Sequence, residues 1–167
     1  MKKILKELYP YIIIVVAVVL FRTFIATPVR VDGDSMNDTL RNNDILILNK
    51  LEKDYDRFDI VVVNYNNTKL VKRIIGMPGE NISYKDNQLY INNKKFNDIE
   101  TSRTTDFTLK ELFDLDIIPE DHYFVMGDNR NNSLDSRDYR VGLIKKEDIV
   151  GVTVFRLYPF NKIGIIK

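Results

Sequence analysis

A long uncharged segment near the N-terminus constrains the fold of this chain more than any other feature. Residues 8–21 carry no charge and are mostly isoleucine and valine, and the apolar character resumes after Arg22. A helix over residues 8–27 is about 30 Å long at roughly 1.5 Å per residue, which is enough to cross a bilayer. Arg22 lies near one end, where its side chain can extend to the lipid headgroups. We therefore predict one transmembrane helix that ends at Pro28.

The charges before this segment predict its orientation. Lys2, Lys3 and Lys6 outnumber Glu7, and positively charged flanks stay on the cytoplasmic side. Residues 1–27 are then a cytoplasmic N-terminus with a single-pass anchor, and residues 28–167 form a domain outside the cytoplasm. A cleavable signal peptide is the alternative, because it also has a basic and an apolar region. Bulky residues stand at 24 and 25, where a signal peptide would have small ones.

Beyond Pro28 the sequence predicts a mainly β domain. Short segments rich in β-branched or aromatic residues, bounded by Asn, Asp, Gly or Pro, are typical of strands in a mixed or antiparallel sheet. These segments are residues 29–31, 44–48, 60–65, 69–75, 123–126 and 149–158. We expect residues 28–167 to form one compact domain.

Two local patterns add a hairpin and a helix to this domain. Residues 82–84 and 89–91 flank the polar pair Asp86-Asn87, which predicts a hairpin. A second polar turn is expected at residues 92–93. Thr108 with Glu111 three residues later fits a capping box, and the apolar residues that follow predict a helix over residues 109–114.

Composition excludes several kinds of function. Without cysteine the chain has no thiol nucleophile, thiolate metal site or disulfide framework, and one histidine cannot form an imidazole cluster for a metal. We expect neither a metal nor another cofactor. With 25 basic and 24 acidic residues and no long run of like charge, the chain lacks the basic stripe of a nucleic-acid-binding protein.

A serine and a lysine remain as a candidate nucleophile and base. Ser35 follows Gly33 and Asp34 in a tight segment, and Lys72 lies inside an apolar run. A serine beside Gly and Asp is most often only a turn residue. Burial, however, lowers the pKa of a lysine, and a pKa roughly two to three units below the usual 10.4 would suit a base near neutral pH.

Strand alternation alone does not decide which basic residue enters the site. Lys72 would share a strand face with Leu70 and Ile74, whereas Arg73 would lie on the other face. A guanidinium effectively never gives up its proton, so only Lys72 could accept one from Ser35. Arg73 is then expected to be an ion-pair or surface residue.

A polar segment, residues 127–137, follows an apolar strand and could organise such a site. It contains little but small polar and charged residues. A solvated loop is the simplest alternative, and aspartate-rich loops also bind calcium. An EF-hand is excluded, because counting from Asp128 there is no glycine at the sixth loop position and no glutamate at the twelfth.

In this order behind an N-terminal anchor, these segments resemble the bacterial type I signal peptidases. The matching pieces are residues 33–36 with 39–40, then 59–63, 71–79 and 127–137. The short length is similar to the single-anchor form of Gram-positive bacteria. The resemblance implies a signal-peptidase-like β domain on the bacterial cell membrane. The implied activity is that of a serine endopeptidase that cleaves signal peptides from exported precursors after small residues, with a Ser/Lys dyad.

The resemblance also implies roles for individual residues. Ser35 becomes the nucleophile, whose backbone N–H helps to form the oxyanion hole, and Lys72 the general base. Ser133 is implied to hydrogen-bond and orient the lysine, while Asp135 and Arg137 form a buried ion pair that fixes the loop. Residues implied to contact the substrate or line its shallow pockets are Val29, Val31, Met36, Leu40, Val62 and Val71. The implied partners are signal peptides, membrane lipid and the export translocase, without nucleic acid.

The sequence departs from this family at two positions. Members usually have a proline two residues after the methionine, whereas here the run from Ser35 to Leu40 contains none, which frees the backbone. We expect this to affect the turnover rate more than the mechanism. Gly33 stands where some members carry a hydroxyl residue that donates to the oxyanion, so that donor is absent.

Two other functions are compatible with the same segments. A related dyad performs self-cleavage in SOS-response repressors, but such a protein would have a DNA-binding module where this chain has its apolar segment. A tethered, non-catalytic peptide-binding module is the third hypothesis.

Two further regions are expected to have structural roles. His122 is expected to be a turn residue. Apolar residues between 155 and 166 are expected to form a core strand with an apolar edge, and a weaker hypothesis lets some of them enter the membrane interface.

Overall fold

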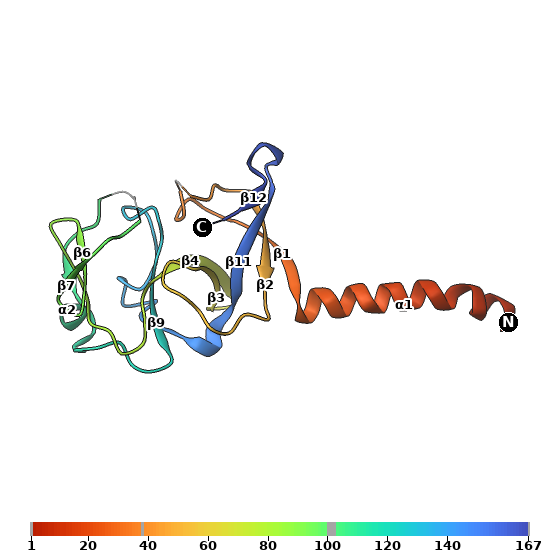
Figure 1. Ribbon diagram of the computed structural model, residues 1–167, viewed down its shortest axis with the longest axis horizontal. Helices are drawn as coiled ribbons and strands as arrows, with labels where there is room; N and C mark the ends of the chain where they lie inside the picture. The colour runs from red at the N-terminus through yellow and green to blue at the C-terminus, as the bar shows by residue number, and fades with distance from the viewer. Residues whose placement is uncertain (1, 38, 100–102, 167) are drawn as a thin grey trace.

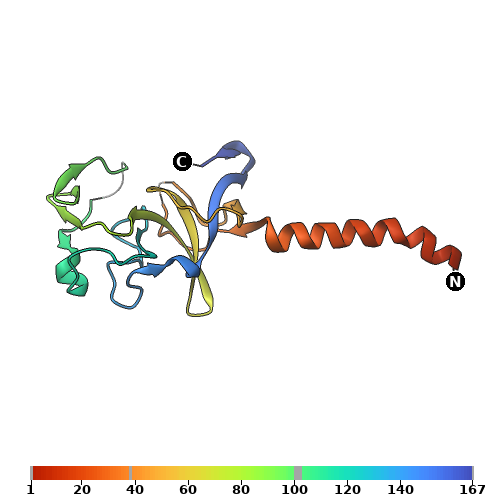
Figure 2. The ribbon, with the colours of Figure 1, turned by 60° about the horizontal axis from the view of Figure 1, so that its bottom comes forward.

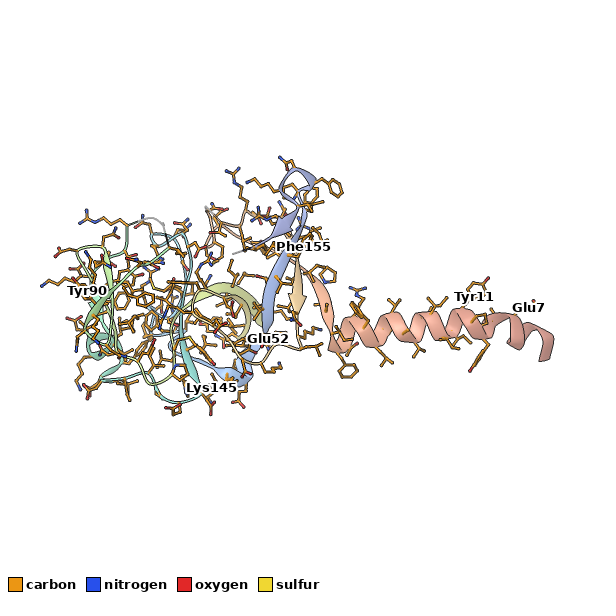
Figure 3. All side chains as sticks on the ribbon, in the orientation of Figure 1. Glu7, Tyr11, Glu52, Tyr90, Lys145 and Phe155 are labelled. Carbon is orange, nitrogen blue, oxygen red and sulfur yellow. The ribbon has the colours of Figure 1, made fainter. Side chains whose placement is uncertain are left out.

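A single long helix projects from a β-rich body. The computed structural model describes residues 2–37, 39–99 and 103–166. Helix α1 (Lys2–Phe24) extends alone to one side of the body (Figures 1 and 2). Its residues 7–24 have a mean hydropathy of 1.8 and none of them is buried. Figure 3 shows their side chains pointing outward around the helix, among them Tyr11. The helix therefore has the length and composition of a membrane span.

The helix ends earlier than the sequence predicted. It stops at Phe24 rather than at Thr27, and strand β1 (Ala26–Arg30) begins two residues later. Strand β1 pairs with β2 (Ile45–Asn49), starting with Ala26 opposite Asn49. This pairing places Ala26 and Thr27 in the sheet, although the sequence predicted them in the helix. Pro28 fits inside β1 because this strand is at the edge of its sheet.

The larger sheet carries most of the predicted strands. Its order is β1-β2-β11-β3-β4-β9-β10, and β12 pairs with β11. The neighbouring strands of this sheet pair antiparallel, so of the two predicted arrangements, mixed or antiparallel, the second is correct. The remaining members are β3 (Ile60–Tyr65), β4 (Thr68–Gly76), β9 (His122–Met126), β10 (Ile144–Lys145), β11 (Ile149–Tyr158) and β12 (Gly164–Ile165).

A smaller second sheet, of order β7-β6-β5-β8, lies at the end of the body away from α1 (Figure 1). Strands β5 (Ile82–Lys85) and β6 (Gln88–Ile91) form the predicted hairpin, and Asp86 and Asn87 in its turn both have positive φ. The sequence did not predict β7 (Lys94–Phe96) or β8 (Phe107–Thr108), which are short and carry little apolar pattern. Helix α2 (Leu109–Phe113) has the predicted capping box at Thr108.

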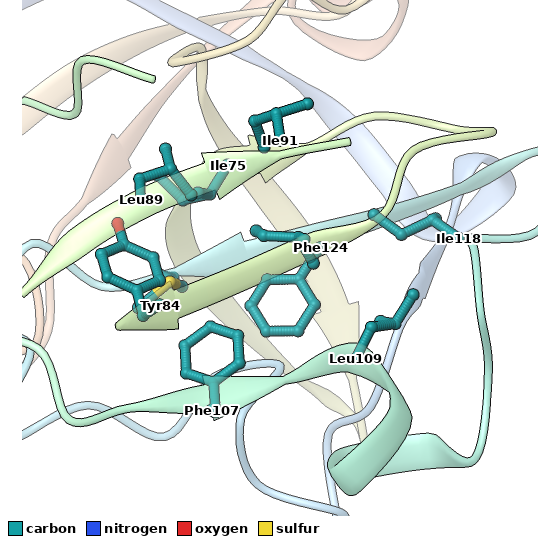
Figure 4. Close-up of a cluster of buried hydrophobic side chains, with 10 residues drawn as sticks. Ile75, Tyr84, Leu89, Ile91, Phe107, Leu109, Ile118 and Phe124 are labelled. Carbon is teal, nitrogen blue, oxygen red and sulfur yellow. The ribbon is translucent and has the colours of Figure 1, made fainter. Parts of the chain in front are cut away.

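Three apolar clusters hold the body together. The first fills the space between the small sheet and strands β4 and β9, where the rings of Phe107 and Phe124 stack at 5.4 Å (Figure 4). The second packs around β3, β4 and β9. The third lies beneath the loop that follows β1, and it consists of Val31, Met36, Leu40, Leu46 and Ile60. The described residues also include the 3₁₀ turns η1 (Lys146–Asp148) and η2 (Phe160–Lys162).

Candidate active site

Ser35 lies in the loop between β1 and β2, in a turn that apolar side chains anchor. The backbone N–H of Leu40 donates to the carbonyl of Met36 at 2.8 Å, and that of Asn37 donates to Asp34 at 3.1 Å. The side chains of Met36 and Leu40 are buried in the third apolar cluster. Because both ends of the turn are fixed from below, Ser35 is held at a defined place above the sheet.

Lys72 reaches Ser35 from the middle of β4. It lies opposite Val61 of β3, and its side chain is only 2% exposed. Nζ donates a hydrogen bond to Ser35 Oγ at 2.6 Å, although 37 residues separate the two in the sequence. The structure thus brings together the two residues that the sequence singled out, at a distance suited to proton transfer.

The surroundings of Lys72 lower its pKa. Burial is the largest cause, since it removes water from the charged form and lowers the pKa from 10.5 to about 8. The negative charges of Asp135 and Asp128 oppose this effect, and the positive charge of Arg137 adds to it. A pKa near 8 leaves a usable fraction of neutral amine at neutral pH, as a general base requires.

Arg73, the next residue along β4, has a different role. It is 1% exposed, and its guanidinium makes two parallel hydrogen bonds to Asp128, at 2.9 and 2.8 Å. Nη1 also donates to the carbonyl of Phe58 at 2.8 Å. Of the two expectations for Arg73, the ion pair is correct and the surface position is wrong.

The polar segment 127–137 folds back on itself through Asp135. This carboxylate is fully buried, accepts from the backbone N–H of Gly127 at 3.0 Å and forms an ion pair with Arg137 at 2.8 Å. Burial pushes the pKa of Asp135 upward, but the hydrogen bonds and charge of Arg137 prevail and hold it below its usual value. Arg137 Nη1 also donates to the carbonyl of Arg130 at 2.8 Å. Asp135 and Arg137 therefore make the contact that the family resemblance implied.

Gly127 allows this segment to lie directly against the nucleophile. A Cβ atom at this position would lie 2.2 Å from Ser133 Oγ and 2.4 Å from the carbonyl oxygen of Ser35, so only glycine fits. Ser133 Oγ is buried there, but within the described residues it makes no hydrogen bond to Lys72. The implied role of Ser133 in orienting the lysine stays a prediction.

Sequence reasoning missed two further contacts of the polar segment. Asn129 donates from its backbone N–H to the carbonyl of Ser35 at 3.0 Å and from Nδ2 to that of Asp34 at 3.1 Å. Arg130 Nη1 donates to the hydroxyl of Tyr84 in the small sheet at 2.7 Å and to Asp98, two residues beyond β7, at 2.9 Å. These partners lie 32 to 95 residues away in sequence, so no local pattern could have revealed them.

A cleft of about 210 Å³ opens beside Ser35 and Lys72. Most of the residues expected to contact substrate line it, namely Val29, Val31, Met36, Val62 and Val71. Leu40 is the exception, because it is completely buried in the third apolar cluster behind the cleft. Three charged residues that the sequence did not single out are also part of the lining: Arg30, Asp32 and Lys69.

His122 lies outside this site. It begins β9, and its Nδ1 is 2.9 Å from the carbonyl oxygen of Glu120, two residues earlier. The cleft lining does not include it.

Comparisons with known proteins identify the family of this chain. The family of signal peptidases, peptidase S26, matches residues 4–158. A signal peptidase I of Bacillus amyloliquefaciens is 43% identical over 93% of this chain and 89% of its own length. Signal peptidase I S of Bacillus subtilis is 42% identical over 96% of this chain and 92% of its own length.

A solved structure supports the same assignment. The crystal structure of a signal peptidase I from Enterococcus faecalis aligns with a TM-score of 0.53 and 36% sequence identity, over 59% of this chain and 96% of that one. The match confirms the expected fold class, a mainly β domain of the signal-peptidase type behind an apolar N-terminal helix. This chain therefore belongs to the signal peptidase family S26, a family of serine proteases that cleave signal peptides.

Proposed function

We propose that Ser35 and Lys72 are the nucleophile and general base with which this signal peptidase cleaves exported precursors. The observation that carries the proposal is the 2.6 Å hydrogen bond from Lys72 Nζ to Ser35 Oγ, made by a lysine that is 2% exposed. Neutral Lys72 takes the hydroxyl proton while Ser35 Oγ attacks the scissile carbonyl. The lysine then gives the proton to the leaving amine, and an acyl-enzyme remains.

Hydrolysis of this acyl-enzyme repeats the same steps with water. Lys72 takes a proton from the water, which attacks the ester carbonyl, and Ser35 recovers its proton when the bond to Oγ breaks. The backbone N–H of Ser35 is the proposed oxyanion donor, a contribution typically worth about 3–4 kcal/mol of transition-state stabilisation. The side chain of Asn129 donates from Nδ2 to the carbonyl of Asp34 at 3.1 Å, and this carbonyl belongs to the same peptide group as the N–H of Ser35, so Asn129 would keep that group in place.

The cleft suggests how the substrate binds. Its apolar walls include the edge strand β1 through Val29 and the strand β4 through Val71. An extended segment can add to such an edge as another strand, with alternate side chains entering shallow pockets. The small volume of about 210 Å³ favours small side chains close to the cut. Leu40 would act indirectly, as support for the loop of Ser35.

Membrane attachment follows from α1 and from the basic N-terminus. We propose that α1 spans the bacterial cell membrane once, with Lys2, Lys3 and Lys6 in the cytoplasm and the β domain outside, because positive flanks stay inside. In that orientation the cleft faces the compartment in which exported precursors emerge. We also propose that the export translocase delivers those precursors, and only the membership in the signal peptidase family supports this partner.

Membrane lipid is a second proposed partner, at the C-terminal hairpin. Exposed apolar side chains cluster where β11 turns through η2 into β12, with Phe160 at 78%, Ile163 at 52% and Ile165 at 77% exposed. Figure 1 shows this blue turn on the side of the body from which α1 leaves. Apolar and aromatic side chains at that level would lie among the lipid headgroups.

The test is cleavage of a precursor with Ala-x-Ala before its cut site, by the full chain reconstituted in lipid. Ser35→Ala and Lys72→Ala should each abolish cleavage, and His122→Ala, remote from the cleft, is the matched control that should retain it. Circular dichroism verifies that each variant is folded. A folded wild type that does not cut, or cleavage that persists without Ser35 or Lys72, would leave the non-catalytic binding module as the better hypothesis.

A further inference from the structure

A lysine from a neighbouring strand holds the end of α1. Lys50 directly follows β2, and its Nζ donates to the carbonyl oxygens of Arg22 and Thr23 at 3.0 and 3.1 Å. Both carbonyls belong to the last turn of α1, where backbone oxygens lack partners inside the helix and carry the negative end of its dipole. The backbone N–H of Lys50 donates to the carbonyl of Ile25 at 2.9 Å as well. Lys50 therefore caps α1 with two hydrogen bonds and holds the residue that follows the helix with a third.

The connection between α1 and the large sheet is short. Only Ile25 separates α1 from β1, and the pairing of β1 with β2 begins at once with Ala26 opposite Asn49. Strand β11 supports the corner from the other side, since a Cβ on Gly151 would lie 2.1 Å from the carbonyl oxygen of Asn49. Figure 1 shows that α1, β1, β2 and β11 come together at this corner, and its hydrogen bonds place Lys50 there.

The same strand that continues from α1 also lines the catalytic cleft. Strand β1 has five residues, of which Val29 and Arg30 are part of the cleft lining, and Ser35 follows five residues later. The direction in which α1 leaves β1 consequently determines how the cleft lies relative to the helix. Any rotation of α1 at Ile25 would tilt the cleft relative to the bilayer that α1 crosses.

We propose that Lys50 is a positioning residue that fixes the height of the cleft above the membrane and thereby selects which bond of a membrane-embedded precursor is cut. This inference rests on the proposed function. The apolar segment of a precursor is held in the bilayer, so a cleft at fixed height meets one part of the extended chain that follows. Without the cap, α1 and the body can take several relative orientations, and the cleft reaches neighbouring small-residue sites.

The test uses the full chain in lipid vesicles and a precursor with several successive Ala-x-Ala sites after its apolar segment. Lys50→Met keeps the length of the side chain but removes the donor, while Lys50→Arg keeps a charged donor. Lys53→Met is the matched control for the loss of one charge close to the lipid, because Lys53 is exposed and has no hydrogen bond or ion pair within the described residues. Mass spectrometry of the products identifies each cut.

We expect wild type and Lys53→Met to cut mainly at one site, and Lys50→Met to distribute its cuts over neighbouring sites. Lys50→Arg should restore much of the wild-type preference. A short soluble peptide without the apolar segment serves as the second substrate. On it, kcat/KM of the three variants should stay within about twofold of wild type, since Lys50 is outside the cleft and surface changes usually have small effects.

A direct measurement of orientation complements the cleavage pattern. The chain has no cysteine, so two introduced cysteines can carry spin labels without background. Val16 in α1 and Tyr139 in the body are both exposed, and Val16→Cys with Tyr139→Cys would report the distance between helix and body. We expect the distance distribution to broaden in Lys50→Met and to stay narrow in Lys53→Met.

Several outcomes would overturn the inference. One is a Lys50→Met enzyme with the same cut sites and distance distribution as the control. Another is an equal redistribution of cuts in Lys53→Met, which would assign the effect to charge at the lipid surface. A parallel loss of soluble-peptide cleavage in Lys50→Met would assign it to damage of the cleft. Failure of the proposed function looks different, because then the wild type cuts neither substrate, or Ser35→Ala cuts both.

Discussion

Strand β4 places two buried cations side by side, and their surroundings differ in the way that decides their roles. Arg73 faces a carboxylate with ideal geometry, at 2.9 and 2.8 Å from the two oxygens of Asp128, and donates to a backbone carbonyl as well. Lys72 has the hydroxyl of Ser35 as its partner at 2.6 Å and lines an open cleft. The charge of Arg73 is balanced by the carboxylate of Asp128. Among the described residues, the charge of Lys72 has no such partner in direct contact, and burial disfavours it.

The difference teaches how a fold can prepare a base. Burial with a bidentate carboxylate favours the charged form of a side chain, and burial beside a hydroxyl favours the neutral form. Arg73 should contribute to stability as long as Asp128 is present, whereas Lys72 should cost stability that the enzyme exchanges for reactivity.

The largest expected effect is the stability lost when Arg73, the cation that is paired with a carboxylate, is replaced. Arg73→Leu leaves Asp128 buried without its main partner, and breaking such a pair typically lowers the free energy of unfolding by about 3–5 kcal/mol. Chemical denaturation monitored by circular dichroism measures the loss. The double variant with Asp128→Leu should recover part of it, because no unpaired charge remains. Equal stability of Arg73→Leu and wild type would show that the pair does not hold the loop.

Lys72→Met should have the opposite sign on stability. The pKa of Lys72 is about 8 in the folded protein and 10.5 when unfolded, so the unfolded state binds the proton more tightly. The resulting penalty, on the order of 3 kcal/mol, is fully present below pH 8 and disappears as the pH rises to 10.5. At pH 7 the inactive Lys72→Met protein should therefore be the more stable one. Denaturation at pH 7 and pH 10 checks both the gain and its decline, and a variant less stable at pH 7 would contradict it.

Charges in the polar segment should move the pH dependence of activity in opposite directions. Asp135 raises the pKa of Lys72 and Arg137 lowers it. Asp135→Asn should shift the acid limb of kcat/KM, set by deprotonation of Lys72, to lower pH, and Arg137→Met should shift it to higher pH. Profiles on a soluble peptide measure both shifts. Movement in the same direction would mean that the segment acts through its position instead of its charge.

The smallest effect is expected from Thr39. Its hydroxyl accepts from Arg73 Nη2 at 3.4 Å, a long contact that adds little to the bonds with Asp128. Thr39→Val should change the free energy of unfolding by less than about 0.5 kcal/mol, as for most substitutions outside special contacts. Thermal unfolding beside wild type provides the measurement. A loss as large as that of Arg73→Leu would show that Arg73 depends on more than its carboxylate.

Local sequence patterns predicted much of the large sheet. Strands β3 and β11 have the predicted bounds, and α2 has its capping box, because alternation and cap chemistry operate within a few residues. The end of α1 was wrong by three residues, since a strand partner 23 residues away competes with the helix for Ala26 and Thr27. Strands β7 and β8 form only because the hairpin beside them offers free edges.

In the candidate site, too, the sequence identified some residues, whereas others could be found only from the fold. The pair of Ser35 and Lys72 could be found because Lys72 lies in an apolar run, Ser35 in a tight segment, and the order of these segments behind an apolar helix resembles the signal peptidases. The Arg73–Asp128 ion pair and the contacts of Arg130 could not, because acidic residues are abundant and only the fold selects the partner. Leu40 was expected at the substrate and is buried behind it, a distinction that depends on how the turn after Ser35 packs.

The most direct test of this account is the titration of Lys72 itself. In the full chain in detergent, with lysines labelled by carbon-13 at Cε, the resonance missing from Lys72→Met identifies the residue. We predict that this signal titrates near pH 8, well below the ordinary value of a lysine side chain. If it titrated at the usual value of about 10.4 instead, Lys72 would be charged at neutral pH and could not be the base that activates Ser35.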